Sequence, residues 1–197
     1  MNTTQGTGPA LMAAAAAETA RVVVGATKTP LDQATPCGDW DLRTLLNHTI
    51  LWTSYSAERR AHGESVAEEL MSKDFTADPD FAQDYEAQVN KAVQAWSDPA
   101  AWAGDRNVMG GAMPAADIAA MLIMETVLHG WDVARATGQD YRCGADLAQA
   151  VLGTVQAQGD MFRQYQGFAV VVPVPDDATT VDRVLGLSGR DPQWESS

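Results

Sequence analysis

With 197 residues, 46% of them hydrophobic, the chain is long enough to bury the core of one domain, and we expect no second domain. Its formal net charge of −13 argues against a nucleic-acid partner, because phosphate recognition needs clustered Lys and Arg, and the 13 basic residues are scattered. The same charge argues against binding to an anionic membrane surface.

The cysteines and the N-terminal sequence indicate a soluble, cytoplasmic protein. Two cysteines, Cys37 and Cys143, do not make a disulfide framework in a chain of this size, so a reducing compartment is expected. Residues 1–8 are polar and glycine-rich, lack the basic segment of a secretory signal, and are expected to be disordered. The alanine tract at residues 13–17 is flanked by charges, and we find no apolar run of membrane-spanning length.

Hydrophobic residues recur at steps of three and four along most of the chain, which predicts helices. The predicted helices span residues 9–25, 41–63, 81–96, 114–138, 144–167 and 181–187. Either Asp39 or Asp41 can cap the second helix. Residues 64–80 are predicted to be a connection with one short helical turn, residues 104–114 a loop, and residues 168–175 an extended segment over the helices.

These elements predict an all-α fold, a four-helix bundle with a long connection and a short C-terminal cap helix. Residues 81–96 are expected to be a shorter helix beside the four substantial ones, and residues 9–197 to form the single domain. The core of such a bundle is the natural place for a metal ion held by facing helices.

The helix predicted at residues 114–138 carries the most informative pattern. Its apolar face is interrupted by Glu125 and His129, which lie one turn apart and can therefore close on a single metal ion. Asp132 shares this face but lies about 10 Å from Glu125 along the axis, so it is expected to orient His129 or to contact a substrate. His48 is the only other histidine on an apolar helical face, which makes it the candidate third ligand.

The alternative interpretation needs no metal. Glu125 and His129 can form a buried, hydrogen-bonded pair, and His48 can be a satisfied core histidine. Spacing alone does not separate the two interpretations. The remaining histidine, His62, stands beside charged residues at a helix end, where a solvated cap is expected.

Two segments closely resemble the paired signatures of the DinB-like metalloproteins. They are TPCGDWDLRTLLNHTI at residues 35–50 and METVLHGWDVARATG at residues 124–138. The likeness is greatest to the N-terminal domain of mycothiol-dependent maleylpyruvate isomerase and its small actinobacterial relatives. The ending VPVPDDATTVDRVLGLSGRDP, residues 172–192, is similar to the ending of those stand-alone relatives.

This resemblance implies both a metal and a reaction. In that family the histidine of the NH motif and the E-x-x-x-H pair bind a divalent ion, commonly zinc. The resemblance therefore implies that His48, Glu125 and His129 are the ligands in this chain. Nickel, iron and manganese are the other possible ions. The isomerase has an additional C-terminal domain that contributes to catalysis and that this sequence lacks. We therefore expect this chain to share the fold and the metal site of the family more closely than its reaction.

Two histidines and one carboxylate leave a coordination position open, which is typical of a catalytic metal. The resemblance favours a metal-bound thiolate, with mycothiol or another low-molecular-weight thiol as cosubstrate. The first hypothesis is a thiol-dependent transferase or isomerase acting on a small electrophile, in a monomer or homodimer. The alternatives are a hydrolase that uses metal-bound hydroxide and a non-catalytic metal-binding or stress-response module.

Aromatic and thiol side chains are the next candidates. Trp52, together with Trp40 and Trp131, can wall a substrate pocket, although tryptophans on helical stripes usually belong to the core. Cys37, beside proline and glycine, is expected to be inert packing, with a thiol near the metal as the alternative. Cys143 is expected to be inert as well.

Three arginines are candidates for binding an anionic group. They are Arg43, Arg106 and Arg135. Each can hold the carboxylate of a substrate or of a thiol cofactor. Each can equally pair with an acidic residue on the surface.

Overall fold

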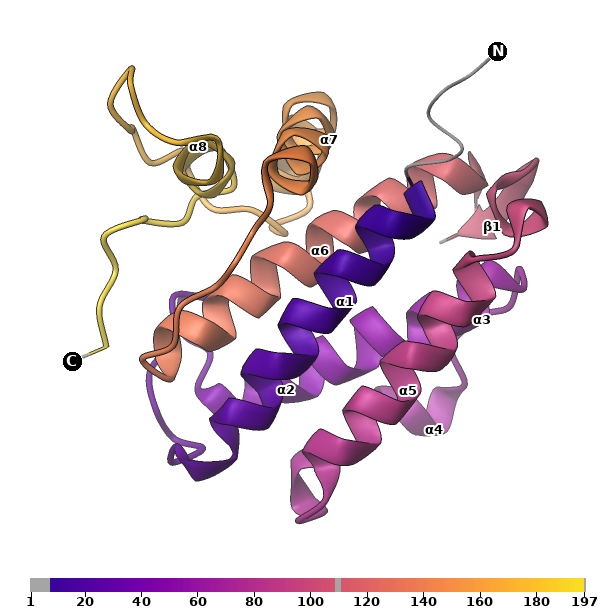
Figure 1. The fold of residues 1–197 in the computed structure, drawn as a ribbon, viewed down its shortest axis with the longest axis horizontal. Helices are drawn as coiled ribbons and strands as arrows, with labels where there is room; N and C mark the ends of the chain where they lie inside the picture. Colours follow the sequence, from indigo (N-terminus) through magenta and orange to yellow (C-terminus); the bar gives the residue numbers. More distant parts are fainter. Residues whose placement is uncertain (1–7, 109–110, 197) are drawn as a thin grey trace.

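The chain forms the predicted all-α bundle in a computed structural model that describes residues 8–108 and 111–196 (Figure 1). Four long helical elements make up the bundle, and residues 81–96, expected to be a shorter helix beside the four, form one of them. They are α1 (Gly8–Gly25), a continuous stretch of α2 (Leu42–Ile50), a π-helical turn (Leu51–Tyr55) and α3 (Ser56–Ala61), then α5 (Phe81–Trp96), and α6 (Ala115–Ala136).

The remaining elements are short or lie against the bundle. They are α4 (Glu68–Met71), 3-10 turns at Ala26–Lys28, Phe75–Ala77 and Pro99–Trp102, strands β1 (Asp105–Val108) and β2 (Gly111–Pro114), and helices α7 (Ala145–Gln164) and α8 (Thr180–Leu187). Helices α7 and α8 pack together, and α7 contacts α6 on the side away from α5 (Figure 1). The C-terminal cap helix is therefore present, and it covers α7.

Helix α1 packs between α5 and α6, and small side chains allow the close approach. A Cβ atom at Gly130 of α6 would overlap the hydroxyl of Thr19 on α1. That hydroxyl donates a hydrogen bond of 2.9 Å to the carbonyl of Thr126. Three alanines of α1, Ala15, Ala16 and Ala20, are buried in the core.

By length and composition, the stretch Gly8–Lys28 passes as a candidate membrane span, with a mean hydropathy of 1.3. The prediction that no run of this kind exists is therefore wrong by this measure. The stretch is nevertheless 44% buried, and Met12, Val22 and Val23 lie in the apolar core. One face of this stretch therefore packs inside the bundle.

The structure defines where the first two helices begin. Helix α1 begins at Gly8, so the expected disorder cannot include that residue, and residues 1–7 lie outside the described residues. Helix α2 is capped by Asp41 and not by Asp39, because the Asp41 carboxylate accepts a hydrogen bond of 2.8 Å from the backbone N–H of Thr44.

The loop predicted at residues 104–114 is wrong, because β1 and β2 pair there as an antiparallel hairpin. The pairing runs from Asp105 opposite Pro114 to Val108 opposite Gly111. Strands of four residues are too short to produce a clear alternation of apolar and polar positions. The hairpin leads directly into α6, where Pro114 precedes the first helical residue.

The π-helical turn changes which side chains of the second bundle element share a face. Eight residues of regular α-helix would place Arg60 about 80° around the axis from Trp52. The wider π turn absorbs one residue, and the Arg60 guanidinium returns to lie 5.5 Å from the centroid of the Trp52 ring. Since His48 precedes Trp52 by one turn, all three side chains come to the same side of the element.

Candidate metal centre

The three side chains predicted as ligands meet between α2 and α6. His48 Nε2 lies 2.7 Å from Glu125 Oε1, and His129 Nε2 lies 3.3 Å from the same oxygen. One ligand atom from each residue lies within 4.8 Å of the other two. Two imidazole nitrogens and one carboxylate oxygen in this arrangement fit a divalent metal ion.

This cluster is open on one side. The side chains of His48 and Glu125 are each 25% exposed, whereas the side chain of His129 is 9% exposed. Two tryptophans flank the opening: the Trp40 ring lies 4.8 Å from the His48 ring by centroid, and the Trp52 ring 6.1 Å from it. The cluster is therefore partly exposed to solvent beside two aromatic side chains.

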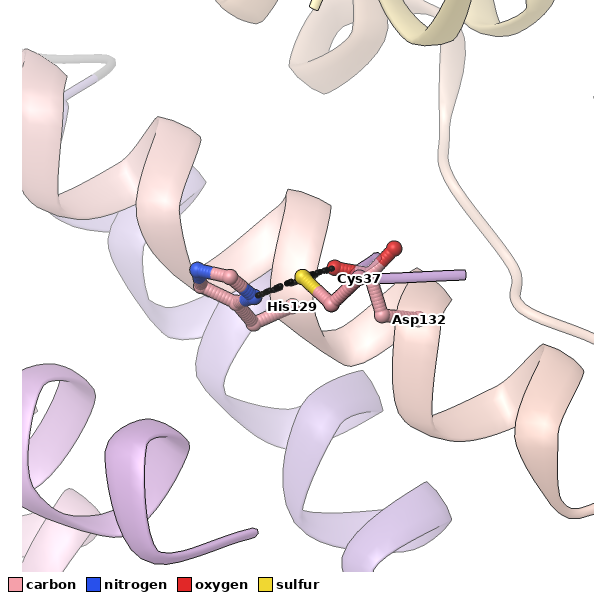
Figure 2. Close-up of side chains that lie close together, drawn as sticks. All are labelled: Cys37, His129 and Asp132. Atoms are coloured by element: carbon pink, nitrogen blue, oxygen red, sulfur yellow. Dashed lines mark hydrogen bonds and ion pairs between the residues drawn. The ribbon is translucent and has the colours of Figure 1, made fainter. Parts of the chain in front are cut away.

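The second nitrogen of His129 faces a different set of groups (Figure 2). Asp132 Oδ2 lies 3.0 Å from His129 Nδ1, which is the orienting contact that the helical spacing predicts. Cys37 Sγ lies 3.8 Å from the same nitrogen and 3.3 Å from Asp132 Oδ2. These three residues form a second group whose atoms fit a divalent ion by distance.

Cys37 lies beside the cluster, which is the alternative to inert packing that the sequence left open. Its loop, TPCGDW, directly precedes α2, so the chain that brings His48 to the site also brings the thiol. The other cysteine, Cys143, fits its expectation: it is half-buried away from the cluster, and burial raises the pKa of its thiol to about 11.

Sequence reasoning missed Arg190, which forms a buried ion pair with Asp132. Arg190 Nε donates to Asp132 Oδ1 at 2.8 Å, and Arg190 Nη2 donates to Asp132 Oδ2 at 2.7 Å. Asp132 is fully buried, and Arg190 is 7% exposed. Because a guanidinium already compensates this carboxylate, a divalent cation beside it would be repelled, which favours the group of His48, Glu125 and His129 as the metal site.

The carboxylates and imidazoles of the cluster stabilise each other's charged forms, which shifts the pKa of Glu125 and that of His129. Burial would raise the pKa of Glu125, but the imidazoles of His129 and His48 hold it well below its usual range. Burial would likewise lower the pKa of His129, whereas the carboxylates of Glu125 and Asp132 raise it well above its usual value. Against the effect of burial, Arg190 and His129 hold the pKa of Asp132 at about 2. Without a metal, His129 is thus an imidazolium between two carboxylates.

The other predicted candidates lie elsewhere. Arg43 pairs with Asp74 on the surface at 3.0 Å, which is the alternative expected for it. Arg106 and Arg135 donate to backbone carbonyls. Trp131 is buried in the apolar core.

Arg60 is the arginine that the structure brings toward the opening. Its guanidinium lies over Trp52, burial lowers its pKa, and the nearby Glu125 carboxylate opposes that shift. The π-helical turn that places Arg60 here left no signal in the sequence pattern.

The fold and this cluster define a DinB-like helical bundle with side chains suited to a divalent metal. The chain matches the family described as the mycothiol maleylpyruvate isomerase N-terminal domain over residues 12–134, more than half of its length, and it belongs to that family. The match confirms the resemblance and includes His48, Glu125, His129 and Asp132, whereas Arg190 lies beyond it. Comparisons with curated proteins and with solved structures found no match.

Replacing Asp132 with asparagine should retain metal binding and weaken it by about 10- to 100-fold, the usual cost of losing a partner that orients a ligand. The reason is that Asp132 contacts the His129 nitrogen opposite the one that faces Glu125. Zinc affinity of Asp132→Asn, measured by competition with a chelator, checks this. Complete loss of binding would mean that Asp132 is itself a ligand.

Proposed function

We propose that the protein is a divalent-metal-dependent transferase or isomerase that uses a thiol and acts on a small electrophile. Zinc is the proposed ion, with His48, Glu125 and His129 as its ligands. The observation that carries the proposal is this donor set, two histidines and one carboxylate, with its open side between Trp40 and Trp52. Three protein ligands leave a coordination position for an exogenous group, as in catalytic zinc sites.

When bound, the ion would supply Lewis acidity that lets a thiol lose its proton near neutral pH. The surrounding residues have separate tasks. Asp132 holds the His129 ring through Nδ1, so that Nε2 faces the site. Trp40 and Trp52 wall the open side and limit water there, while Arg60 offers a cation to an anionic group of the electrophile or the thiol.

The family supports the choice of a thiol. Its description names mycothiol and an isomerase, and the candidate ligands all fall within the matched residues 12–134. Mycothiol or a similar low-molecular-weight thiol is therefore the proposed cosubstrate.

Zinc affinity should rise with pH, because the ion needs neutral imidazole and the pKa of metal-free His129 is raised well above its usual value. Below that pKa, binding must displace the His129 proton, so the affinity should increase about tenfold per pH unit and level off above it. Calorimetry in buffers of different ionisation enthalpy measures the released protons. Proton-independent binding between pH 6 and 8 would contradict the assignment of His129 as a ligand.

A cobalt-substituted protein tests the reaction. Adding mycothiol, or a simpler thiol, should produce a sulfur-to-cobalt charge-transfer band, and the band should be absent in Glu125→Gln and His129→Ala. Thiol binding should also strengthen as pH rises toward the free thiol's pKa of about 8.5. If saturating thiol gives no band in protein that holds one cobalt per chain, the thiol proposal fails and a hydrolase or a non-catalytic metal protein becomes the better proposal.

A further inference from the structure

We propose that Arg190 is a positioning residue of the metal centre: it acts through Asp132 on His129, so that metal binding and docking of the C-terminal segment favour each other. The inference rests on the proposed metal at His48, Glu125 and His129. It adds a residue outside the part of the chain that the family match covers, residues 12–134.

A direct line of contacts joins Arg190 to the cluster. Two guanidinium nitrogens hold the two oxygens of Asp132 at 2.8 and 2.7 Å, a bidentate arrangement that fixes the plane of the carboxylate. One of those oxygens, Oδ2, lies 3.0 Å from His129 Nδ1. His129 Nε2, on the opposite side of the ring, faces Glu125. Arg190 thus sets the orientation of the ring without touching the proposed metal site.

The burial of this ion pair favours a positioning role. Removing two charges from water is costly, and well-packed apolar residues often stabilise a fold as well as or better than a buried ion pair does. Asp132 and Arg190 are nevertheless both inside, aimed at the non-ligating nitrogen of a proposed metal ligand. Partners of this kind commonly fix the tautomer and orientation of metal-binding histidines.

The segment that carries Arg190 is placed by its own local structure. Helix α8 ends at Leu187, and Gly189 has a φ of +84°, a left-handed conformation that lets the chain reverse toward α6. The Arg190 backbone N–H then donates to the carbonyl of Leu185 at 2.9 Å, and its Nη1 donates to Ser188 Oγ at 3.2 Å. These two hydrogen bonds fix the backbone and the guanidinium of Arg190 beside Asp132.

Another arginine anchors the same segment without contacting Asp132, which provides a matched control. Arg163 of α7 donates to the Leu187 carbonyl at 2.9 Å and pairs with Asp160. Its loss should remove one hydrogen bond of the C-terminal segment, but the Arg190–Asp132 ion pair should keep the segment docked and the Asp132 carboxylate in place. The two arginines therefore separate positioning of His129 from general support of the segment.

Coupling between the two sites must be reciprocal. If a docked Arg190 strengthens zinc binding by some factor, zinc must favour the docked segment by the same factor. Zinc should therefore slow hydrogen exchange of the Arg190 backbone N–H, which bonds to Leu185 at the end of α8. This measurement uses the wild-type protein and needs no variant to fold.

The test measures zinc affinity and the cobalt d–d spectrum of Arg190→Gln, Asp132→Asn, the double variant and Arg163→Gln. Arg190→Gln should weaken zinc by about 10- to 100-fold and alter the spectrum, and the double variant should match Asp132→Asn. Arg163→Gln should stay within about threefold of wild type. The double variant keeps a neutral pair of side chains, so it is expected to fold even if Arg190→Gln is unstable.

Any one of the following results would overturn the inference alone, given a wild type that binds zinc. They are an unchanged affinity in Arg190→Gln, an equal loss in Arg163→Gln, and zinc-independent exchange of the Arg190 amide. Losses that add in the double variant would likewise show that Arg190 does not act through Asp132. A wild type that binds no zinc would overturn the proposed function, and the inference with it.

Discussion

The His48→Ala protein should lose its divalent metal, and the His62→Ala protein should keep it. His48 is the only member of the proposed ligand set that comes from outside α6, so its removal leaves two ligands on one helix. The loss of affinity should exceed the roughly 100-fold that removal of an orienting partner costs, because a direct ligand is removed. His62 is the matched control, since it is exposed at the end of the same helical element.

Metal content per chain, measured in untagged protein, distinguishes the outcomes. The His48 side chain is 25% exposed, so its truncation should leave the bundle folded, and circular dichroism of both variants checks this. A His48→Ala protein that is folded and still holds one ion per chain would refute the ligand assignment. The site would then have to lie elsewhere, for instance at Cys37, His129 and Asp132.

The features predicted correctly from the sequence are those encoded within one helix. The pairing of Glu125 with His129 follows from a spacing of four residues, and the contact of His129 with Asp132 from a spacing of three. The bounds of α5, Phe81–Trp96, agree with the prediction because its apolar spacing ends just before a proline. Local rules suffice for such features.

The features that were missed depend on how distant parts of the chain pack. Arg190 stands 58 residues from Asp132, and Cys37 stands 92 residues from His129, so no periodicity connects them. Arg60 reaches the opening only because of a π-helical turn, which depends on the packing of the element and not on a residue pattern. Apart from His48, which was predicted from its apolar helical face and from the family resemblance, the site was predictable along α6 but not across the bundle.

Replacing Arg190 with methionine should destabilise the metal-free protein by about 3–5 kcal/mol, because it leaves the Asp132 carboxylate buried without its guanidinium. For a chain of this length the loss corresponds to a fall in Tm of roughly 10 °C. A second change, Asp132→Leu, should restore most of the stability, since two apolar side chains then fill the space of the ion pair. Urea unfolding of the single and double variants measures both effects.

The pH dependence and the zinc affinity of these variants separate stability from positioning. The pKa of Asp132 is lowered from 3.8 to about 2 in the folded protein, so its stabilising effect is fully present above pH 3.8 and is lost as pH falls through about 2. The difference in stability between wild type and Arg190→Met should therefore be largest near neutral pH and shrink as pH falls from about 4 toward 2. The Arg190→Met, Asp132→Leu double variant should regain stability yet bind zinc more weakly than wild type, because His129 has lost its orienting carboxylate. If the double variant regained both stability and zinc affinity, the ion pair would stabilise the fold and have no role in positioning His129.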